Sequence, residues 1–199
     1  MMSLYIFTNF KKTLFMKKLL IAFSMIVSVS TVSAQINKGQ WLVGGNAGFT
    51  SSKEGDFKTT TFQFSPNAGY FFINNLAGGL RLNINSQKEK FNDDEETATT
   101  TSIAPFVRYY FLPAAQKVNV FADASYSFGS VKYDDGTNDE KVNVNGFSVS
   151  AGPAIFLTPN TALELTLGYN SSKIEDADES TGTFLFGVGF QIHLGNGSK

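Results

Sequence analysis

The sequence contains no cysteine and only one histidine among its 199 residues. Without cysteine, the chain can form no disulfide framework, thiolate nucleophile or cysteine-ligated zinc site. Apart from one segment near the N-terminus, no uninterrupted apolar run approaches the length of a membrane-spanning helix. These absences exclude a helical membrane bundle. They do not exclude a transmembrane β-barrel, whose strands alternate apolar and polar residues.

The sequence also lacks the patterns that carry catalysis and cofactor binding. The single histidine, His193, stands at the end of the last apolar segment, and no serine or aspartate pattern beside it completes a nucleophile and base. The Gly-Gly pairs at 44–45 and 78–79 lie inside alternating segments with no helical pattern after them, so neither is a phosphate-binding loop. We therefore expect a protein that is not an enzyme and that holds no cofactor or metal.

The one long apolar segment has the organisation of a secretory signal peptide. A basic pair at 17–18 precedes the apolar run 19–27, and small residues end at Ala34, before Gln35. The run is shorter than the roughly 20 residues that a spanning helix requires. We predict that residues 1–34 are a signal peptide, cleaved after Ala34.

Met16 is the expected translation start, because the basic pair of the signal peptide follows it directly. Removal of residues 1–34 changes the formal net charge from −1 to −5, because four lysines leave with them. An acidic exported chain is a poor candidate for binding nucleic acid.

The final apolar segment, 183–194, alternates strictly between two kinds of residue. Its even positions carry bulky apolar residues, and its odd positions are mostly small or polar. Such alternation predicts a β-strand, because successive side chains point to opposite faces. A soluble barrel would place its bulky apolar side chains inside, whereas a barrel in lipid presents them outward. The segment therefore predicts a strand of a transmembrane barrel.

Seven similar segments precede it between residues 40 and 171, which predicts an all-β fold. We expect an eight-stranded antiparallel up-and-down transmembrane β-barrel over residues 35–194, followed by a short C-terminal tail, 195–199. Three proline residues fall inside the expected strands, where the missing N–H removes a ladder hydrogen bond. We interpret Pro66, Pro105 and Pro153 as bulges or strand-end irregularities.

The expected connections alternate in length along the chain. Short turns are predicted at 74–75, 112–117 and 159–160, the first because asparagine tolerates a left-handed φ. Between them we expect longer polar loops, as in bacterial barrels with long extracellular loops and short periplasmic turns. The four predicted polar loops are 51–58, 88–97, 132–141 and 172–181.

Aromatic residues gather near the ends of the expected strands. Aromatic girdles at the two membrane interfaces are typical of transmembrane barrels. The predicted girdle residues are Trp41, Tyr70, Phe71, Phe72, Tyr109, Tyr110, Phe111, Tyr126, Phe128 and Tyr169.

Charged residues avoid the outward strand positions. Fifteen of the seventeen acidic residues fall in the four polar loops, which have a net charge of −8 with their seven lysines. The expected strands contain four charged residues, all at inward positions nearer the short turns: Arg81, Arg108, Asp123 and Glu164. Because an unpaired charge in a narrow interior is costly, we predict a charge network in the lumen. Arg108 and Asp123 are expected on neighbouring strands.

Two roles are open for this network: a gate or selectivity element, and a plug that fills the lumen. An eight-stranded barrel encloses little more space than its side chains fill, which favours the plug. The acidic runs 93–96 and 134–135 offer oxygen ligands for divalent cations but lack the ordered spacing of a calcium loop. A solvated surface loop is the favoured interpretation.

The chain resembles the small outer-membrane β-barrel proteins, namely the OmpX/OmpW-like proteins and the membrane domain of OmpA. The resemblance covers about residues 35–194 and rests on the signal peptide, the glycine-rich segment 41–49 and the hairpin 69–80. It implies a monomer in the outer membrane of a Gram-negative bacterium, surrounded by outer-membrane lipid and lipopolysaccharide and inserted by the barrel-assembly machinery. Family chains usually end on an aromatic residue, whereas here five residues follow Leu194.

We expect a structural or surface-interaction role, with two alternatives. One is a narrow porin-like channel for small solutes, which differs only in whether the lumen leaves a water path. The other is a secreted lipocalin-type carrier, because residues 39–41 match the Gly-x-Trp that opens the first lipocalin strand and both folds are eight-stranded barrels. No helical pattern follows the last strand and the inward faces read as polar, so the membrane barrel is favoured.

Overall fold

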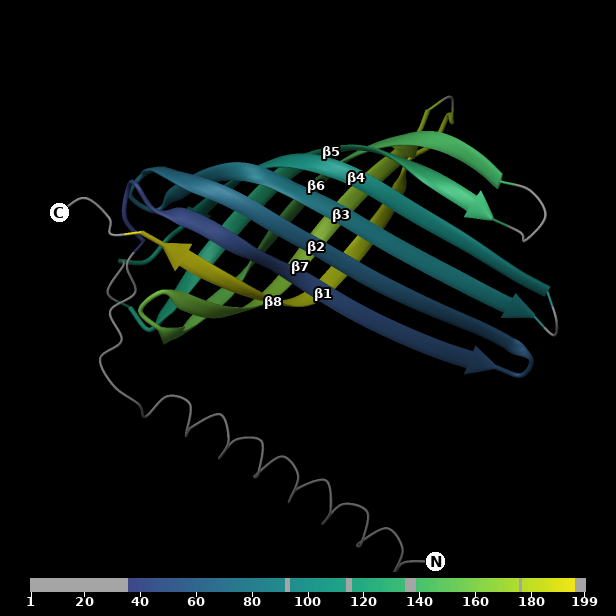
Figure 1. Cartoon of the computed structure of the whole chain (residues 1–199), viewed down its shortest axis with the longest axis horizontal. Helices are drawn as coiled ribbons and strands as arrows, with labels where there is room; N and C mark the ends of the chain where they lie inside the picture. Colours follow the sequence, from purple (N-terminus) through teal and green to yellow (C-terminus); the bar gives the residue numbers. More distant parts are fainter. Residues whose placement is uncertain (1–35, 92–93, 114–115, 135–138, 176, 196–199) are drawn as a thin grey trace, which may run out of the picture. The chain divides into compact units, whose positions relative to one another are not determined.

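The computed structural model describes residues 36–91, 94–113, 116–134, 139–175 and 177–195, which form one closed antiparallel barrel (Figure 1). Each strand pairs with the next along the chain, and β8 returns to β1. The eight-stranded up-and-down fold is therefore confirmed. The strands are β1 (Trp41–Glu54), β2 (Phe57–Ile73), β3 (Leu76–Phe91), β4 (Asp94–Tyr110), β5 (Val118–Asp134), β6 (Asp139–Thr158), β7 (Thr161–Ile174) and β8 (Thr181–Leu194).

Several expectations concern residues outside this described part. The predicted signal peptide, 1–34, and the start at Met16 lie there, as do residues 196–199 of the tail. Within the described ranges, no helix is long and apolar enough to cross a membrane.

The two faces of each strand differ in the way that the alternation predicts. In β4, exposed Ile103 and Val107 alternate with buried Arg108 and Tyr110. The outer wall carries large exposed apolar side chains on every strand, reaching 82% exposure at Phe184. Such a surface is costly in water and favourable against hydrocarbon. The wall is therefore built to face lipid.

The strands run further than predicted at one end of the barrel. Residues 51–54 and 88–91 belong to β1 and β3, and the hairpins close through the short connections 55–56 and 92–93. Expected loops of eight to ten residues were therefore wrong here. Threonines of the partner strands, such as Thr59 and Thr97, continue the pairing, and polarity alone does not end a strand above the apolar band. The connection 111–117, at the opposite end, is longer than either, so the predicted alternation of loop lengths was also wrong.

We name the two ends by these features: the polar hairpin end carries the connections after β1, β3, β5 and β7, and the short-turn end carries the others. At the short-turn end, Asn75 has φ 68°, as predicted for a left-handed turn residue. At the polar hairpin end, Glu95 and Asp134 take outward strand positions. The prediction that acids avoid such positions was wrong for these two, because the extended strands carry them beyond the apolar band.

The three prolines inside strands do not shift the register. Pro66 pairs with Gly45 on the β1 side, and the β2–β3 pairing stops at Phe64 and resumes at Asn67 in the same register. The pairs around Pro105 and Pro153 behave in the same way, each interrupted on one side only. The prediction of bulges was wrong, because a missing N–H affects only the neighbour to which it would have donated.

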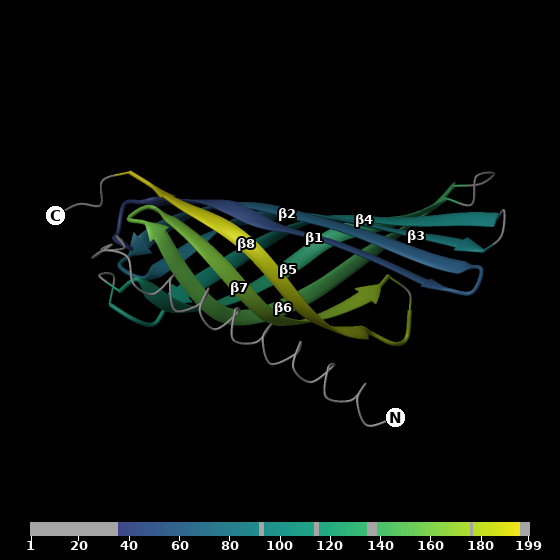
Figure 2. The same ribbon diagram turned by 90° about the horizontal axis from the view of Figure 1, so that it is seen from below.

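The seam between β1 and β8 closes only at the short-turn end. Pairing runs from Trp41–Leu194 to Ala47–Val188 and then ends. Residues 48–54 and 181–187 pair with β2 and β7 but not with each other, and Figure 2 shows β1 and β8 diverging. Elsewhere in the ring, the pairs extend close to the strand tips.

Candidate functional site: the filled lumen

The lumen near the short-turn end contains the four charged residues singled out in the sequence. Arg108 and Asp123 are directly opposite on β4 and β5, and Arg108 Nε donates to Asp123 Oδ2 over 3.1 Å. Arg108 Nη1 lies 3.0 Å from both carboxylate oxygens of Glu164. Because β4 and β7 are not neighbours in the ring, this second contact crosses the lumen.

Arg81 joins the same network from β3. Its Nη2 donates to Asp123 Oδ2 over 2.9 Å, so one carboxylate receives two guanidinium groups. Two cations and two anions thus form one connected, charge-balanced set. The side chains of Arg108, Asp123 and Glu164 are at most 3% exposed, and that of Arg81 is 12% exposed.

One aromatic ring packs against each of the two guanidinium groups. The Cζ atom of Arg108 lies 4.5 Å from the centroid of the Phe121 ring, and that of Arg81 lies 4.9 Å from the centroid of Phe106. Such stacking stabilises a desolvated cation. Tyr110 adds a hydrogen bond from its hydroxyl to Glu164 Oε1 over 3.2 Å. Nearly every polar group of the network therefore has a partner, as a buried ion set requires.

A layer of apolar and aromatic side chains closes the lumen beside the network, at the short-turn end. Its rings include Phe71, Tyr110, Phe121 and Phe156, all fully buried. His193 is buried among them, with its ring centroid 5.3 Å from Phe156 and 5.5 Å from Phe71. We call this layer the floor, and it comprises Leu42, Phe71, Ala77, Tyr110, Phe121, Ala154, Phe156, Ala162 and His193.

The segment before β1 covers the floor from outside. Ile36 and Gln40 are both fully buried there. The amide of Gln40 donates to the Gly195 carbonyl over 3.1 Å, and Gly39 N donates to the Phe71 carbonyl over 3.0 Å. These contacts tie the start of the barrel to its end and to β2.

The floor was missed in the sequence, and two of its residues were placed elsewhere. Phe71 and Tyr110 were predicted in the interfacial girdles, yet both point inward and are fully buried. Alternation along the fourth strand already predicts an inward position for Tyr110, and the same parity could have shown it for Phe71, because each neighbours outward aromatic residues along its strand. The outward rings do cluster at the short-turn end, with Trp41 against Tyr70 and Tyr109 against Phe111.

An amide pair closes a further part of the lumen beside β1. Asn67 and Gln191 donate to each other over 3.1 and 3.0 Å, and both are directly opposite Gly44 in the pairing of β1 with β2 and β8. A Cβ at Gly44 would lie 2.6 Å from Gln191 Oε1. The glycine therefore leaves the space through which two amides on non-neighbouring strands meet.

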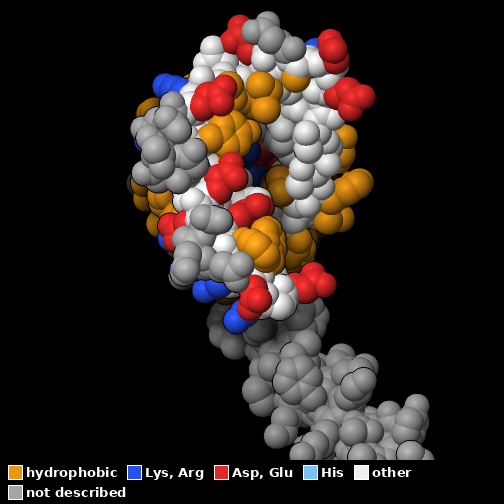
Figure 3. Space-filling view, turned by 90° about the vertical axis from the view of Figure 1, so that its right-hand side faces the viewer, with side chains coloured by type: hydrophobic (Ala, Val, Ile, Leu, Met, Phe, Trp, Pro, Cys, Tyr) orange, Lys and Arg blue, Asp and Glu red, His pale blue; other side chains and the backbone are white. Residues whose placement is uncertain are grey.

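At the polar hairpin end, the mouth of the barrel is hollow and bears acidic side chains around it (Figure 3). Glu54, Glu89, Glu96 and Glu140 take inward strand positions there. Among the described residues, no group of three or more acidic or histidine side chains is placed to hold a metal ion.

An outward apolar wall and an inward charged core define an integral β-barrel of the kind that spans bacterial outer membranes. The chain belongs to the outer membrane protein beta-barrel domain family, whose model matches residues 19–191. This agrees with the resemblance seen in the sequence and places the protein in the outer membrane.

Solved structures include similar barrels. Neisserial surface protein A shares 20% identity at a TM-score of 0.48, covering 77% of this chain and 94% of that protein. The N-terminal barrel domain of Pseudomonas aeruginosa OprF shares 11% at 0.48, covering 79% and 98%. Ail, the attachment invasion locus protein of Yersinia pestis, shares 17% at 0.43, covering 78% and 99%. Comparison with curated proteins gives no significant match.

Proposed function

We propose that this chain is a non-enzymatic integral outer-membrane protein with a plugged lumen and a structural or surface-interaction role. The observation that carries the proposal is the pair of layers near the short-turn end, the charge network around Arg108 and the floor beside it. Both are fully or almost fully buried. Side chains of a narrow barrel can fill its interior without leaving a water path.

The two layers favour a plug over a gate. Opening the network would separate Arg108 from two carboxylates and leave buried charges unpaired, which costs about 3–5 kcal/mol. The floor beside it contains mainly apolar side chains, so moving the charges alone would not admit water. A channel for small solutes would need both layers to move.

The polar hairpins supply the surface for interaction. The inward acids at the mouth form a negatively charged vestibule that suits a cationic partner or divalent cations at low affinity. We propose that the barrel acts as a monomer, surrounded by outer-membrane lipid and lipopolysaccharide. Export through a cleaved signal peptide and insertion by the barrel-assembly machinery complete the proposal.

Electrophoretic mobility of the membrane-extracted protein in SDS, with and without boiling, tests the proposal. A closed barrel resists SDS until it is boiled, so the two samples should migrate differently, and the protein should be found in the membrane fraction. Equal mobility together with a soluble exported protein would overturn the proposal in favour of a lipocalin-type carrier. The exposed outer wall, including Phe186 at 74% exposure, supports the membrane form.

A further inference from the structure

Outward lysines follow the apolar band on several strands toward the polar hairpin end. On five strands, a lysine lies four residues beyond the last outward apolar residue, counted toward this end. At about 3.3 Å per residue this is about 13 Å along the strand, or about 10 Å above the apolar band for a strand tilted by about 40°. The pairs are Phe49 and Lys53, Phe62 and Lys58, Ile84 and Lys88, Phe128 and Lys132, and Tyr169 and Lys173.

Several of these lysines are directly opposite another lysine. Lys58 is paired with Lys53 on one side and with Lys90 on the other, and Lys132 is paired with Lys141. All of these side chains are exposed on the outer face. Like charges directly opposite each other destabilise a sheet, and an anion bound between them would relieve the repulsion.

Four acidic residues of the hairpin strands are turned the other way. Glu54, Glu89, Glu96 and Glu140 take inward positions, whereas all seven hairpin lysines take outward positions. Of the outward acids with described side chains, Glu95 forms an ion pair with Lys88, Asp134 lies 3.9 Å from Lys132, and Glu175 accepts a hydrogen bond from Asn143. The other five lysines make no ion pair with a residue that the structure describes. At the outward strand positions of this level, lysines therefore outnumber acids.

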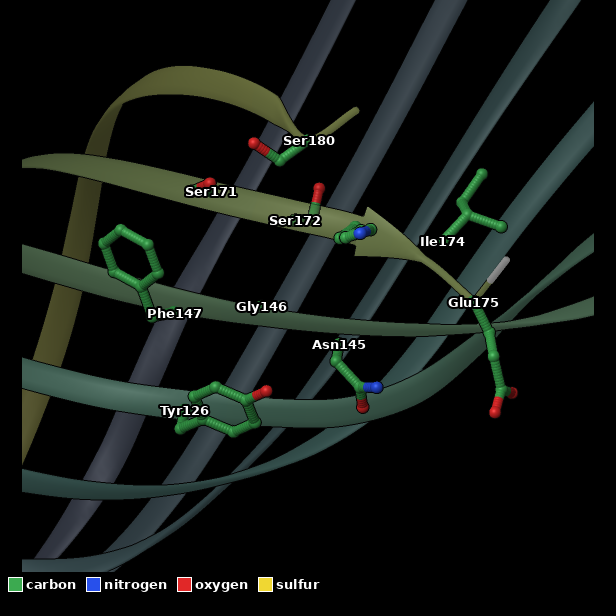
Figure 4. A pocket seen from close by; sticks show the side chains of 10 residues that line it. Tyr126, Asn145, Gly146, Phe147, Ser171, Ser172, Ile174, Glu175 and Ser180 are labelled. Carbon is green, nitrogen blue, oxygen red and sulfur yellow. The ribbon is translucent and has the colours of Figure 1, made fainter. Parts of the chain in front are cut away.

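A groove interrupts the outer wall at the same level. It has a volume of about 480 Å³ and is lined by outward Tyr126 and Phe147, with Asn145 and Ser171 beside them (Figure 4). Lys173, two residues beyond Ser171 on β7, also lines it. Aromatic rings thus lie on the side of the apolar band, and the ammonium group lies on the side of the hairpin tips. Glu175 also lines the groove and accepts a hydrogen bond from Asn143 Nδ2 over 2.6 Å.

We propose that the outward lysines bind phosphate groups of the lipids that surround the polar hairpin end, and that the groove at Lys173 holds one such headgroup. Lysine stems can lie along the apolar wall while their ammonium groups reach an anionic surface. Three features support phosphate binding: the position of the lysines beyond the apolar band, the like-charge pairs and the groove. The inference rests on the proposed outer-membrane location and adds the lipid chemistry that the barrel recognises.

Thermal unfolding in two kinds of vesicle tests the proposal. The full-length protein is reconstituted into phosphatidylcholine vesicles, with or without 20 mol % diphosphorylated lipid A, and the unfolding midpoint is read from the boil-dependent gel shift. Wild type should unfold at a higher temperature with lipid A. The K53Q/K58Q/K90Q variant should lose this increase, with roughly a fivefold loss of lipid A affinity for each lysine removed.

Three controls separate the proposal from simpler explanations. K38Q removes an exposed lysine at the short-turn end and should keep the increase, as should the charge-preserving K53R/K58R/K90R variant. In phosphatidylcholine alone, K53Q/K58Q/K90Q should unfold at the wild-type temperature or above it, because repulsion is relieved. An increase that persists in the glutamine variant, or that free inorganic phosphate reproduces, would overturn the proposal. If no boil-dependent shift occurs in either vesicle, the proposed function itself fails.

Discussion

Arg108 and Glu164 hold opposite walls of the barrel together through one guanidinium nitrogen, which lies 3.0 Å from both carboxylate oxygens. The two residues are 56 positions apart in the sequence and lie on non-neighbouring strands. Asp123 shares Arg108 with Glu164 and also contacts Arg81. The network is thus a brace across the lumen, and it depends most on Arg108, the only member that contacts both acids.

Replacing Arg108 by alanine should destabilise the barrel by about 3–5 kcal/mol, because Glu164 is then left buried without a cation. The measurement is urea unfolding of the refolded protein in detergent micelles, followed by the fluorescence of its single tryptophan, Trp41. The R108M/E164M variant should be less destabilised than R108A. It removes the charged pair together and leaves Asp123 with Arg81.

A loss below about 0.5 kcal/mol in R108A would contradict the structural role of the brace. An R108M/E164M variant that is less stable than R108A would also contradict this role. The double variant leaves no unpaired charge buried, so the account predicts that it is the more stable of the two.

A side chain at Gly44 should destabilise the barrel, in contrast to one at Gly187, which lies on the part of β8 that pairs with β7 but not with β1. A Cβ at Gly44 would lie 2.1 Å from the Phe190 carbonyl oxygen, whereas a Cβ at Gly187 would meet no atom within 4 Å. We expect G44A to destabilise the barrel by about 1–3 kcal/mol and G187A to change its stability by less than about 0.5 kcal/mol. The same urea titration measures both, and equal effects would contradict the packing described for the β1–β8 seam.

The end of the β1–β8 seam can be located with disulfides, because the native chain has no cysteine. Ala47 and Val188 are the last paired residues, and Phe49 and Phe186 would be the next outward pair in the same register. A47C/V188C should therefore form an intramolecular disulfide on mild oxidation, and F49C/F186C should stay mostly reduced, since a disulfide needs Cα atoms within about 7 Å. Non-reducing electrophoresis of unfolded samples reads the result. Equal oxidation of both variants would show that β1 and β8 stay close beyond Ala47 and Val188, toward the polar hairpin end.

The alternation of inward and outward residues along each strand supplied most of what the sequence could predict. Alternation assigned Arg81, Arg108, Asp123 and Glu164 to the inward face, and the structure brings these four side chains together. Parity works here because lipid outside and a narrow lumen inside impose opposite demands on successive residues. A large outward apolar residue such as Phe184 has no other stable place in such a fold.

Strand ends could not be predicted in the same way. Lys53 pairs with Lys58 and Glu89 with Glu96, although all four were expected in loops. Beyond the apolar band both faces meet water, so alternation disappears while backbone pairing continues. The floor was missed for a different reason: Phe71 and Tyr110 stand beside girdle residues in sequence, and only their parity separates a lumen residue from an interfacial one.

Ion conductance of the purified wild-type protein in a planar lipid bilayer tests the plugged lumen most directly. Because the brace and the floor both close the short-turn end, we predict no steady open-channel current, and R108A should remain non-conducting because the floor persists without the brace. A stable ohmic current from wild type would contradict the account and would show that the barrel works as a narrow channel.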